Sequence, residues 1–223
     1  MKKGSDWVET LFKEIGSTVL QQWGIIIIIA IVLILMTRNL SVIPKGKSQT
    51  IIEIFVEGIS NWVKNTMGDK YSGFAAYIGA LVLFLFFMNV TDLIGLHPPT
   101  ADYSVALVLS LTTFLIIHIN SIIKNGGIGY LKGYAHPSPA LIPINILERI
   151  MLPITLSFRL FGNITVATVI IELLLQALSK VTWFAQLAIP VPFMAYFDLF
   201  DGFLQTFIFT ILTMIYIKMT AEE

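Results

Sequence analysis

The sequence contains no cysteine and carries little charge. The absence of cysteine excludes disulfide scaffolds, thiolate metal sites and thiol catalysis. Only 13% of the 223 residues are charged, against about 25% in a typical soluble domain, and this is too little to cover a water-facing surface. The 14 basic residues balance the 14 acidic ones, which excludes a strongly basic nucleic-acid binder and an acidic disordered tail.

Hydrophobic residues take the place of the missing charge. They make up 56% of the chain, and since a membrane helix needs about 20 mostly apolar residues, the chain has enough for roughly five or six spans. Backbone groups in lipid must be hydrogen-bonded within the protein, so long apolar runs predict helices. We therefore expect an all-α integral membrane protein with about five transmembrane helices and one interfacial amphipathic helix. Because there is no internal repeat and no soluble second domain, residues 1–223 should form a single membrane domain.

Apolar runs and their spacing predict the order of the helices. The expected order is an N-terminal segment 1–22, a first span 23–37, an amphipathic helix 48–67, a second span 74–96, a third span 103–123, and two long helices, 143–177 and 185–219. Glycines and prolines predict a polar loop over 124–142. The last two helices are longer than a vertical span requires, so we expect them to form a tilted hairpin.

Lysine and arginine mark the cytoplasmic side of the predicted spans. They gather in the segments 38–73 and 124–142 and near the carboxyl end, whereas the link 97–103 has none. The positive-inside rule places these basic segments and the C-terminus in the cytoplasm and the N-terminus outside. The three lysines of the N-terminal segment are the exception to this pattern.

Charged residues inside the apolar stretches are the main functional signal. One is basic and five are acidic: Asp92, Glu148, Arg159, Glu172, Asp198 and Asp201. A charge at the bilayer centre costs about 2.5–3.5 kcal/mol on insertion scales. Each of these residues should therefore face protein, water or an opposite charge, and all are candidates for an ion path.

Arg159 is the most informative of these residues, because a guanidinium keeps its proton where a lysine would lose it. One interpretation is a structural ion pair with Glu148 or Asp198. The other is a fixed cation that meets a moving carboxylate.

The last helix has a polar face. Asp198, Asp201 and Gln205 follow one another at spacings of three and four residues, so they would share one side of an α-helix. That side is either a set of helix–helix hydrogen bonds or the wall of an aqueous half-pore.

The preceding long helix also carries polar pairs. Arg159 and Asn163 share one face, and Thr168 and Glu172 share another. If the two long helices are antiparallel, the second pair lies near the acidic face of the last helix, and Glu148 lies on the other, cytoplasmic side of Arg159. An acidic site on each side of a central cation predicts two offset half-channels.

Other polar residues are less specific. Asp92, near the outer end of the second span, is either a helix cap or a member of the outer acidic group. The histidines His97, His118 and His136 are too dispersed in the sequence for a metal site.

Several segments resemble one known family. They are Pro98–Asp102 (PPTAD), Pro143–Glu148 (PINILE), Arg159–Asn163 (RLFGN), Gln205–Phe209 (QTFIF) and the C-terminal Tyr216. In combination, from the first apolar run to the end, the chain resembles subunit a of the F-type rotary ATP synthase, the ATPase A chain family.

The resemblance implies an ion-translocating stator subunit in a bacterial plasma membrane. Its partners would be a ring of c subunits, the b subunits of the peripheral stalk, the other synthase subunits and the lipid bilayer, with no nucleic acid. The subunit would have no catalytic activity of its own and no cofactor or metal. The transported ion would be H⁺ or Na⁺.

The resemblance also implies roles for individual residues. The family's arginine corresponds to Arg159, which would engage the ionised carboxylate of a passing c subunit and block leakage between the half-channels. Gln205 would position Arg159, Asn163 is the family's asparagine, and Glu148 corresponds to the acid on the exit side. Two polar positions near the outer half-channel correspond to Asp92 and Asp102.

This chain departs from the family pattern on the outer side. Thr168 stands where the family often has an acid, nine residues after the arginine, and Glu172, one turn later, would take over that role. The residue type at the position of Asp198 varies in the family. We expect Asp198 and Glu172, with Thr168, to form the outer ion relay, and Asp201 to be an additional carboxylate without a family role.

Two other functions compete with this interpretation. A stand-alone ion channel or secondary transporter would share the buried charges, but a transporter usually has internal repeats and broken helices in both halves, and the sequence shows neither. A purely structural membrane subunit would leave Arg159 without a reason to lie at the centre.

Overall fold

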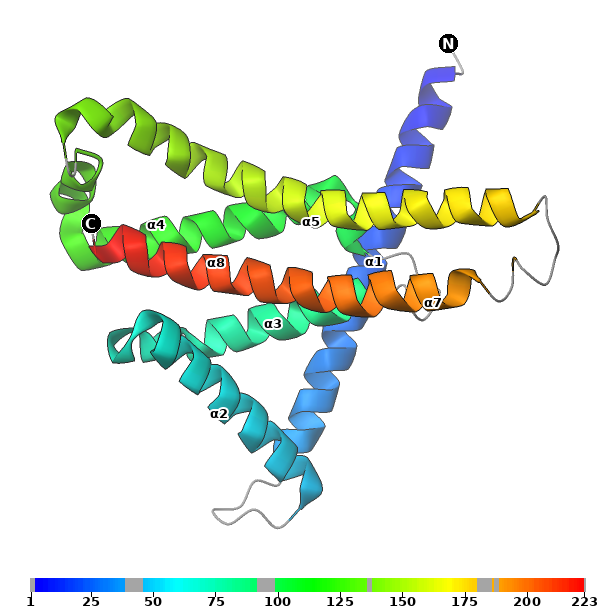
Figure 1. Ribbon diagram of the computed structural model, residues 1–223, viewed down its shortest axis with the longest axis horizontal. Coiled ribbons are helices and arrows are strands. Elements are labelled where there is room, and N and C mark those ends of the chain that lie inside the picture. The colour runs from blue at the N-terminus through cyan, green and yellow to red at the C-terminus, as the bar shows by residue number, and fades with distance from the viewer. Residues whose placement is uncertain are drawn as a thin grey trace. The chain divides into compact units, whose positions relative to one another are not determined.

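The computed structural model describes residues 3–38, 46–91, 99–135, 138–179, 186 and 189–222, and every regular element in this part of the chain is helical (Figure 1). The predicted all-α class is therefore confirmed. Contacts between residues divide the chain into two compact units, Met1–Ser60 and Asn61–Glu223. The prediction of a single membrane domain stays a prediction.

Four helices are long and apolar enough to cross a membrane. They are Asp69–Val90, Tyr103–Gly133, Pro139–Ser179 and Pro190–Glu222. A fifth apolar stretch, Gln22–Thr37, is shorter than these. The sequence analysis expected about five spans, and this shorter stretch corresponds to the first of them.

The first unit contains α1, Lys3–Thr37, and most of α2, Lys47–Met67. The N-terminal segment and the first apolar run, expected as two elements, thus belong to one helix of 35 residues. The end of α2 belongs to the second unit, where Trp62 stacks on Phe207 of α8 with ring centroids 5.3 Å apart.

The predicted polar loop after the third span is largely helical. Helix α3, Ala75–Val90, follows a 3₁₀ turn at Asp69–Phe74, and α4 runs from Tyr103 to Gly133. The loop was expected to begin at residue 124, but α4 continues across a kink at Gly126, whose φ is 72°. Glycine reaches this conformation without the steric cost that a Cβ imposes, so the chain turns at Gly126 between two helical stretches of α4.

The two long helices lie at the end of the chain. Helix α5, Ile142–Ser179, has 38 residues and would be about 57 Å long if straight, far more than the ~30 Å of a bilayer core. The last segment consists of α7, Pro190–Ala195, a π-helical turn, Tyr196–Asp201, and α8, Gly202–Glu222. Figure 1 shows α5 running in the opposite direction to α7 and α8.

The π-helical turn changes the register of the last segment. Its hydrogen bonds join residues i and i+5, so the turn is wider than an α-helical one. The spacing of three that would place Asp198 and Asp201 on one face of an α-helix therefore does not hold within Tyr196–Asp201.

Helix α8 packs against α3 and α4. Buried threonines on α8 satisfy their own hydroxyls, since Thr206, Thr210 and Thr213 each donate to the carbonyl four residues earlier at 2.7–2.8 Å. On α4, Ser121 Oγ donates to Thr220 O at 2.6 Å, and Asn125 Nδ2 donates to Ala221 O at 3.3 Å. Small polar side chains of this kind let membrane helices approach closely.

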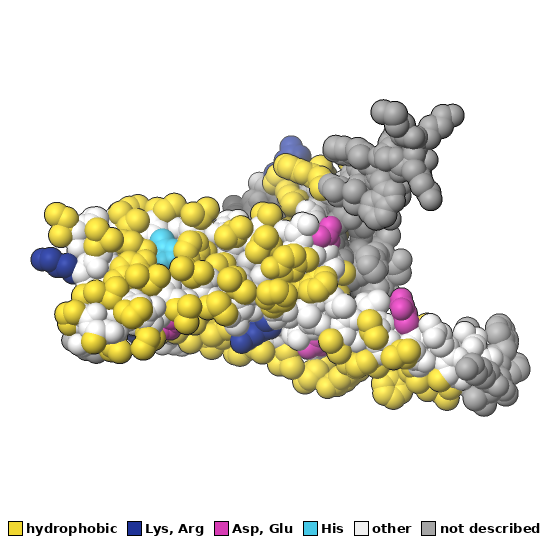
Figure 2. All heavy atoms as spheres, turned by 90° about the horizontal axis from the view of Figure 1, so that it is seen from above, with side chains coloured by type: hydrophobic (Ala, Val, Ile, Leu, Met, Phe, Trp, Pro, Cys, Tyr) yellow, Lys and Arg dark blue, Asp and Glu magenta, His cyan; other side chains and the backbone are white. Residues whose placement is uncertain are grey.

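Helix α5 is much less enclosed than α8. Only 6% of the most apolar stretch of Pro139–Ser179 is buried, against 44% for Pro190–Glu222. Large apolar side chains are exposed on α4 and α5, among them Val108, Leu115, Leu147, Phe158 and Leu173. Figure 2 shows hydrophobic side chains over most of the described face, as expected for a surface that meets lipid or other membrane proteins.

Gly202 offers a test of the packing between α3 and α8. A Cβ at this position would lie 3.1 Å from the Cβ of Asn89. We expect Gly202→Leu to lower the free energy of unfolding by about 1–3 kcal/mol because it overfills this contact. Gly162→Leu is the matched control, because nothing lies within 4 Å of its Cβ position. Denaturation in mixed lipid–detergent micelles measures both, and equal losses would contradict the close contact.

Candidate functional site

Arg159 lies on α5 and is half-buried. Its neighbours Ser157 and Leu160 are fully buried. Among the side chains that the structure describes, Arg159 forms no ion pair within 4.0 Å, so the structural pair with Glu148 considered from the sequence is not made. The side chain of Asp198, the other partner considered, lies outside the described residues.

Asn163 and Gln205 join α5 to α8 beside this arginine. Asn163 Nδ2 donates to Gln205 Oε1 at 2.7 Å. Gln205 is 2% exposed, and its Nε2 has no partner among the described residues. Gln205 makes no hydrogen bond to Arg159 in the described part of the chain, so direct positioning of the arginine stays a prediction. The bond nevertheless fixes the register of the two helices, with Asn163 one turn along α5 from Arg159.

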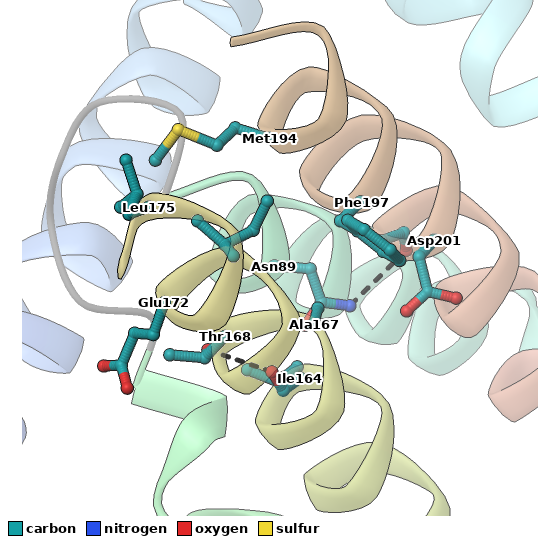
Figure 3. Close-up of a pocket in the computed structure, with 11 residues that line it drawn as sticks. Asn89, Ile164, Ala167, Thr168, Glu172, Leu175, Met194, Phe197 and Asp201 are labelled. Carbon is teal, nitrogen blue, oxygen red and sulfur yellow. Dashed lines mark hydrogen bonds between the residues drawn. The ribbon is translucent and has the colours of Figure 1, made fainter. Parts of the chain in front are cut away.

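A cavity of about 230 Å³ lies on one side of this bond (Figure 3). It is lined from α3, α5, α7, the π-helical turn and the first residue of α8, by Asn89, Ile164, Ala167, Thr168, Ile171, Glu172, Leu175, Met194, Phe197, Asp201 and Gly202. The predicted outer residues Thr168, Glu172 and Asp201 thus meet at one cavity. Its wall is mainly apolar with a few polar groups.

The polar groups of this outer cavity differ in their surroundings. Thr168 Oγ1 donates to Ile164 O of its own helix at 3.0 Å. Glu172 is exposed and Asp201 is half-buried. Figure 3 shows the two carboxylates pointing away from one another, so each lies at its own edge of the cavity. Neither forms an ion pair among the described side chains.

Asn89 is a cavity residue that the sequence analysis did not identify. It is 6% exposed. Its Nδ2 donates to Gly202 O at 3.4 Å, and its Oδ1 accepts from Thr100 Oγ1 at 3.1 Å. The signal in the sequence was an amide within an apolar run, a placement that the membrane makes expensive unless the group finds a partner.

A smaller cavity of about 30 Å³ lies on the other side of the Asn163–Gln205 bond. It is lined by His118, Asn145, Glu148, Arg149, Leu152, Tyr216, Met219 and Thr220. Glu148, the predicted exit-side acid, is exposed at its edge. A space of this size holds at least one water molecule.

The two cavities lie on opposite sides of Arg159 along α5. Glu148 precedes Arg159 by 11 residues and Thr168 follows it by 9. At 1.5 Å per residue these separations are about 16 Å and about 14 Å along the helix axis. The described geometry therefore brings a cation between two spaces that each contain an acid.

Of the remaining predicted residues, the structure describes the side chain of Asp102, which lines neither cavity. Asp102 is the N-cap of α4, where its Oδ1 accepts from the backbone N–H of Ser104 at 2.9 Å, so it has a structural role in α4. Asp92 and the side chain of Asp198 lie outside the described residues. No group of three or more His, Asp or Glu side chains in the described part of the chain could hold a metal ion.

Comparison with known proteins gives one consistent result. Residues 19–218 match the model of a family described as ATP synthase A chain. ATP synthase subunit a of Moorella thermoacetica is 32% identical over 91% of this chain and 89% of its own. ATP synthase subunit a of Streptococcus agalactiae is 36% identical over 86% of this chain and 84% of its own. The sodium ion specific ATP synthase subunit a of Propionigenium modestum is 31% identical over 90% of this chain and 72% of its own.

The Asn163–Gln205 bond can be tested by a double-mutant cycle. We expect Asn163→Leu and Gln205→Leu to be coupled by about 0.6–1.7 kcal/mol in the free energy of unfolding, the range seen for hydrogen bonds between membrane helices. Unfolding of the two single variants and the double variant in mixed micelles measures the coupling. Ser157→Ala with Gln205→Leu is the control pair, because Ser157 donates to Ile154 of its own helix. Strict additivity of the first pair would contradict the hydrogen bond.

Proposed function

The chain belongs to the ATP synthase A chain family, and on this premise we propose which of its residues conduct the ion. A member of this family is a multi-pass membrane protein and the ion-translocating stator subunit of the synthase's membrane part. A stand-alone channel or secondary transporter is not favoured, since the family match covers nearly the whole chain. The proposal below concerns the residues, the ion path and the individual partners.

One observation supports the proposal above all others. Arg159 has no counter-ion among the described side chains, and it lies between two polar cavities on the same helix. An arginine that only stabilised the fold would be expected to find a carboxylate within its own chain. A cation left without one suits a carboxylate that another subunit brings and removes.

In the proposed mechanism, the carboxylate of a passing c subunit reaches Arg159 in its ionised form. The nearby guanidinium favours the charged carboxylate, whereas lipid on the rest of the ring's circumference favours the neutral or ion-bound form. Each ring carboxylate therefore releases its ion on one side of Arg159 and takes up another on the other side. The cation also prevents ions from passing directly from one cavity to the other.

The two cavities would be the inner ends of two half-channels. The outer one would use Thr168, Glu172, Asp198 and Asp201, and Asn89 adds an amide to this group. Glu148 would serve the half-channel on the other side. Asp92 remains a candidate at the outer end, and Asp102 would act there through its cap on α4.

Gln205 and Asn163 would hold the arginine's surroundings in place. Gln205 Oε1 accepts from Asn163 and keeps a second lone pair that the guanidinium of Arg159 can use. The buried Nε2 of Gln205 is a donor that can contact the incoming carboxylate. The amide pair would thus support a cation that has no acidic partner among the described side chains.

Partners and orientation follow from the same proposal. Membership of the family implies other ATP synthase subunits as partners, and we assign the ring contact to the c subunits and the stalk contact to the b subunits. The positive-inside rule places the C-terminus in the cytoplasm of a bacterial cell and the N-terminus outside. The driving ion is H⁺ or Na⁺, and one relative is named as sodium ion specific. We assign no cofactor.

Replacement of Arg159 tests the central role. We expect Arg159→Ala to abolish ion-driven ATP synthesis, because nothing would then favour release of the ion at the boundary between the half-channels. The measurement is ATP synthesis by the assembled complex in liposomes under an imposed ion gradient. Lys132→Ala, which removes an exposed cation on α4, is the control and should keep synthesis. Normal synthesis by correctly assembled Arg159→Ala complexes would overturn the assignment.

Replacement of the outer acids tests the path. We expect Glu172→Gln and Asp201→Asn each to slow ion-driven synthesis, and the double variant to lose about 10²-fold, the usual scale for removal of a proton-transfer group. Rates in liposomes at matched gradients measure the effect. Ser179→Ala removes a polar group from the same helix outside the cavity and should have no effect. An unimpaired double variant would show that ions enter by another route.

A further inference from the structure

A group of aromatic and charged residues beside the smaller cavity has no role in the mechanism so far. Its centre is His118, which is 8% exposed on α4. The hydroxyl of Tyr130 lies 3.0 Å from His118 Nδ1 and 2.6 Å from the hydroxyl of Tyr134. These side chains form a continuous hydrogen-bonded chain from a buried imidazole to a half-buried phenol.

The kink at Gly126 makes this chain possible. His118 and Tyr130 are 12 residues apart, which in a straight α-helix is about 18 Å. Because the backbone turns at Gly126, the end of α4 comes back toward His118 and the two side chains meet. The positive φ of Gly126 thus has a specific structural consequence inside the bundle.

Helix α5 holds the returning segment in place. Asn145 Nδ2 donates to Tyr134 O at 2.9 Å. The guanidinium carbon of Arg149 lies 4.0 Å from the ring centre of Tyr134 and 5.4 Å from that of Tyr130, within the range of cation–π contact. Phe114 packs edge-on against the His118 ring at 4.0 Å. The chain of hydroxyls is therefore fixed by contacts from both helices.

The free nitrogen of His118 gives the chain its chemistry. Nε2 is buried and has no partner among the described residues. A neutral imidazole has one donor and one acceptor nitrogen, so a proton added at Nε2 can leave from Nδ1. His118 also lines the smaller cavity together with Glu148, where a water molecule can bridge between side chains.

We propose that His118 is a proton-relay residue of the half-channel on the Glu148 side, a role that rests on the function proposed above. A proton from Glu148 reaches Nε2 through water in the cavity, and the Nδ1 proton passes to the oxygen of Tyr130. Tyr130 gives its own hydroxyl proton to Tyr134, and Tyr134 gives its proton to water. Each group receives one proton and gives one, which leaves His118 protonated on Nε2. The imidazole then changes tautomer from Nε2–H back to Nδ1–H, and the hydroxyls rotate, to restore the starting state.

The charges around His118 suit a transient relay. The titratable and charged groups that face it are Tyr130 and Tyr134 on α4, Glu148 and Arg149 on α5, and Tyr216 on α8. The positive charge of Arg149 repels a positive charge on the imidazole, so His118 does not stay protonated on both nitrogens. Glu148 is the proton donor at the cavity. Such a chain passes protons and cannot pass sodium ions, so it assigns H⁺ as the ion of this half-channel.

The test uses His118→Gln in the assembled complex in liposomes. We expect proton flux to fall at least about tenfold, because an amide cannot take up and release a proton as an imidazole does. Wild-type flux should change as the pH on the Glu148 side is lowered below the usual range of histidine, because burial and Arg149 disfavour the imidazolium, and the variant should lose this dependence. Tyr130→Phe, which removes only the hydroxyl, should give the same loss and decides the question if His118→Gln does not assemble.

Phe114→Leu is the matched control, because it loosens the packing around the ring and leaves the hydrogen-bonded chain intact. It should keep the wild-type pH profile. Wild-type flux and pH profile in His118→Gln or Tyr130→Phe would overturn the relay, as would a loss equal to that of Phe114→Leu with the profile unchanged. Flux that depends on sodium and not on pH would also overturn it. Arg159→Ala, assayed in parallel, separates these outcomes, since its failure to abolish synthesis would overturn the proposed function itself.

Discussion

The rest of the structure depends on one constraint, which is that Arg159 keeps its positive charge inside an apolar helix. A lysine could lose its proton there, but a guanidinium cannot. No described carboxylate of the same chain forms an ion pair with it, and one turn along α5 lies the hydrogen-bonded amide pair of Asn163 and Gln205. In the proposed mechanism a carboxylate of another subunit neutralises this charge, and the cavities on either side of Arg159 would give ions access to that carboxylate.

Helix α8 holds Gln205, and through it Asn163, in a fixed position beside α5. Its threonines satisfy their hydroxyls within the helix, and Ser121 and Asn125 of α4 occupy carbonyls in its last turns, which would otherwise lack a partner. Because these bonds satisfy the threonine hydroxyls and two of the last carbonyls, α8 can pack closely against α3 and α4. Gln205 is consequently held in a rigid wall, and through it Asn163 is held as well.

The sequence predicts the helical class and the arginine well, because both depend on strong local signals. Long apolar runs predict helices in lipid. A lone arginine in such a run stands out because placing its charge in the bilayer costs free energy. Helical rise converts the sequence distances of Glu148, Thr168 and Glu172 from Arg159 into distances along α5, whereas the position of Asp201 depended on the expected antiparallel arrangement of the two long helices. The roles assigned to them remain predictions.

The features that sequence reasoning missed depend on single backbone angles or on distant partners. The glycines after residue 123 looked like a loop, yet within α4 the described residue with a non-helical backbone is Gly126, where the chain turns between two helical stretches. The π-helical turn altered a face that had been derived from α-helical spacing. The N-cap bond from Ser104 N–H to Asp102 was not identified from the sequence, and the expected position of Asp102 near the outer half-channel stays a prediction. The role of Asn89 depends on hydrogen bonds to Gly202 and Thr100, which are distant in the sequence and could not be predicted from it.

The exposure of α5 has a mechanical meaning. A helix whose side chains interlock with its own fold cannot let a neighbour slide past without disturbing that packing, because interiors are close-packed and resist small displacements. Most of the apolar surface of α5 is instead free of the chain's own core. A helical surface of another subunit can therefore move along α5 without disturbing the packing of α8 in the core.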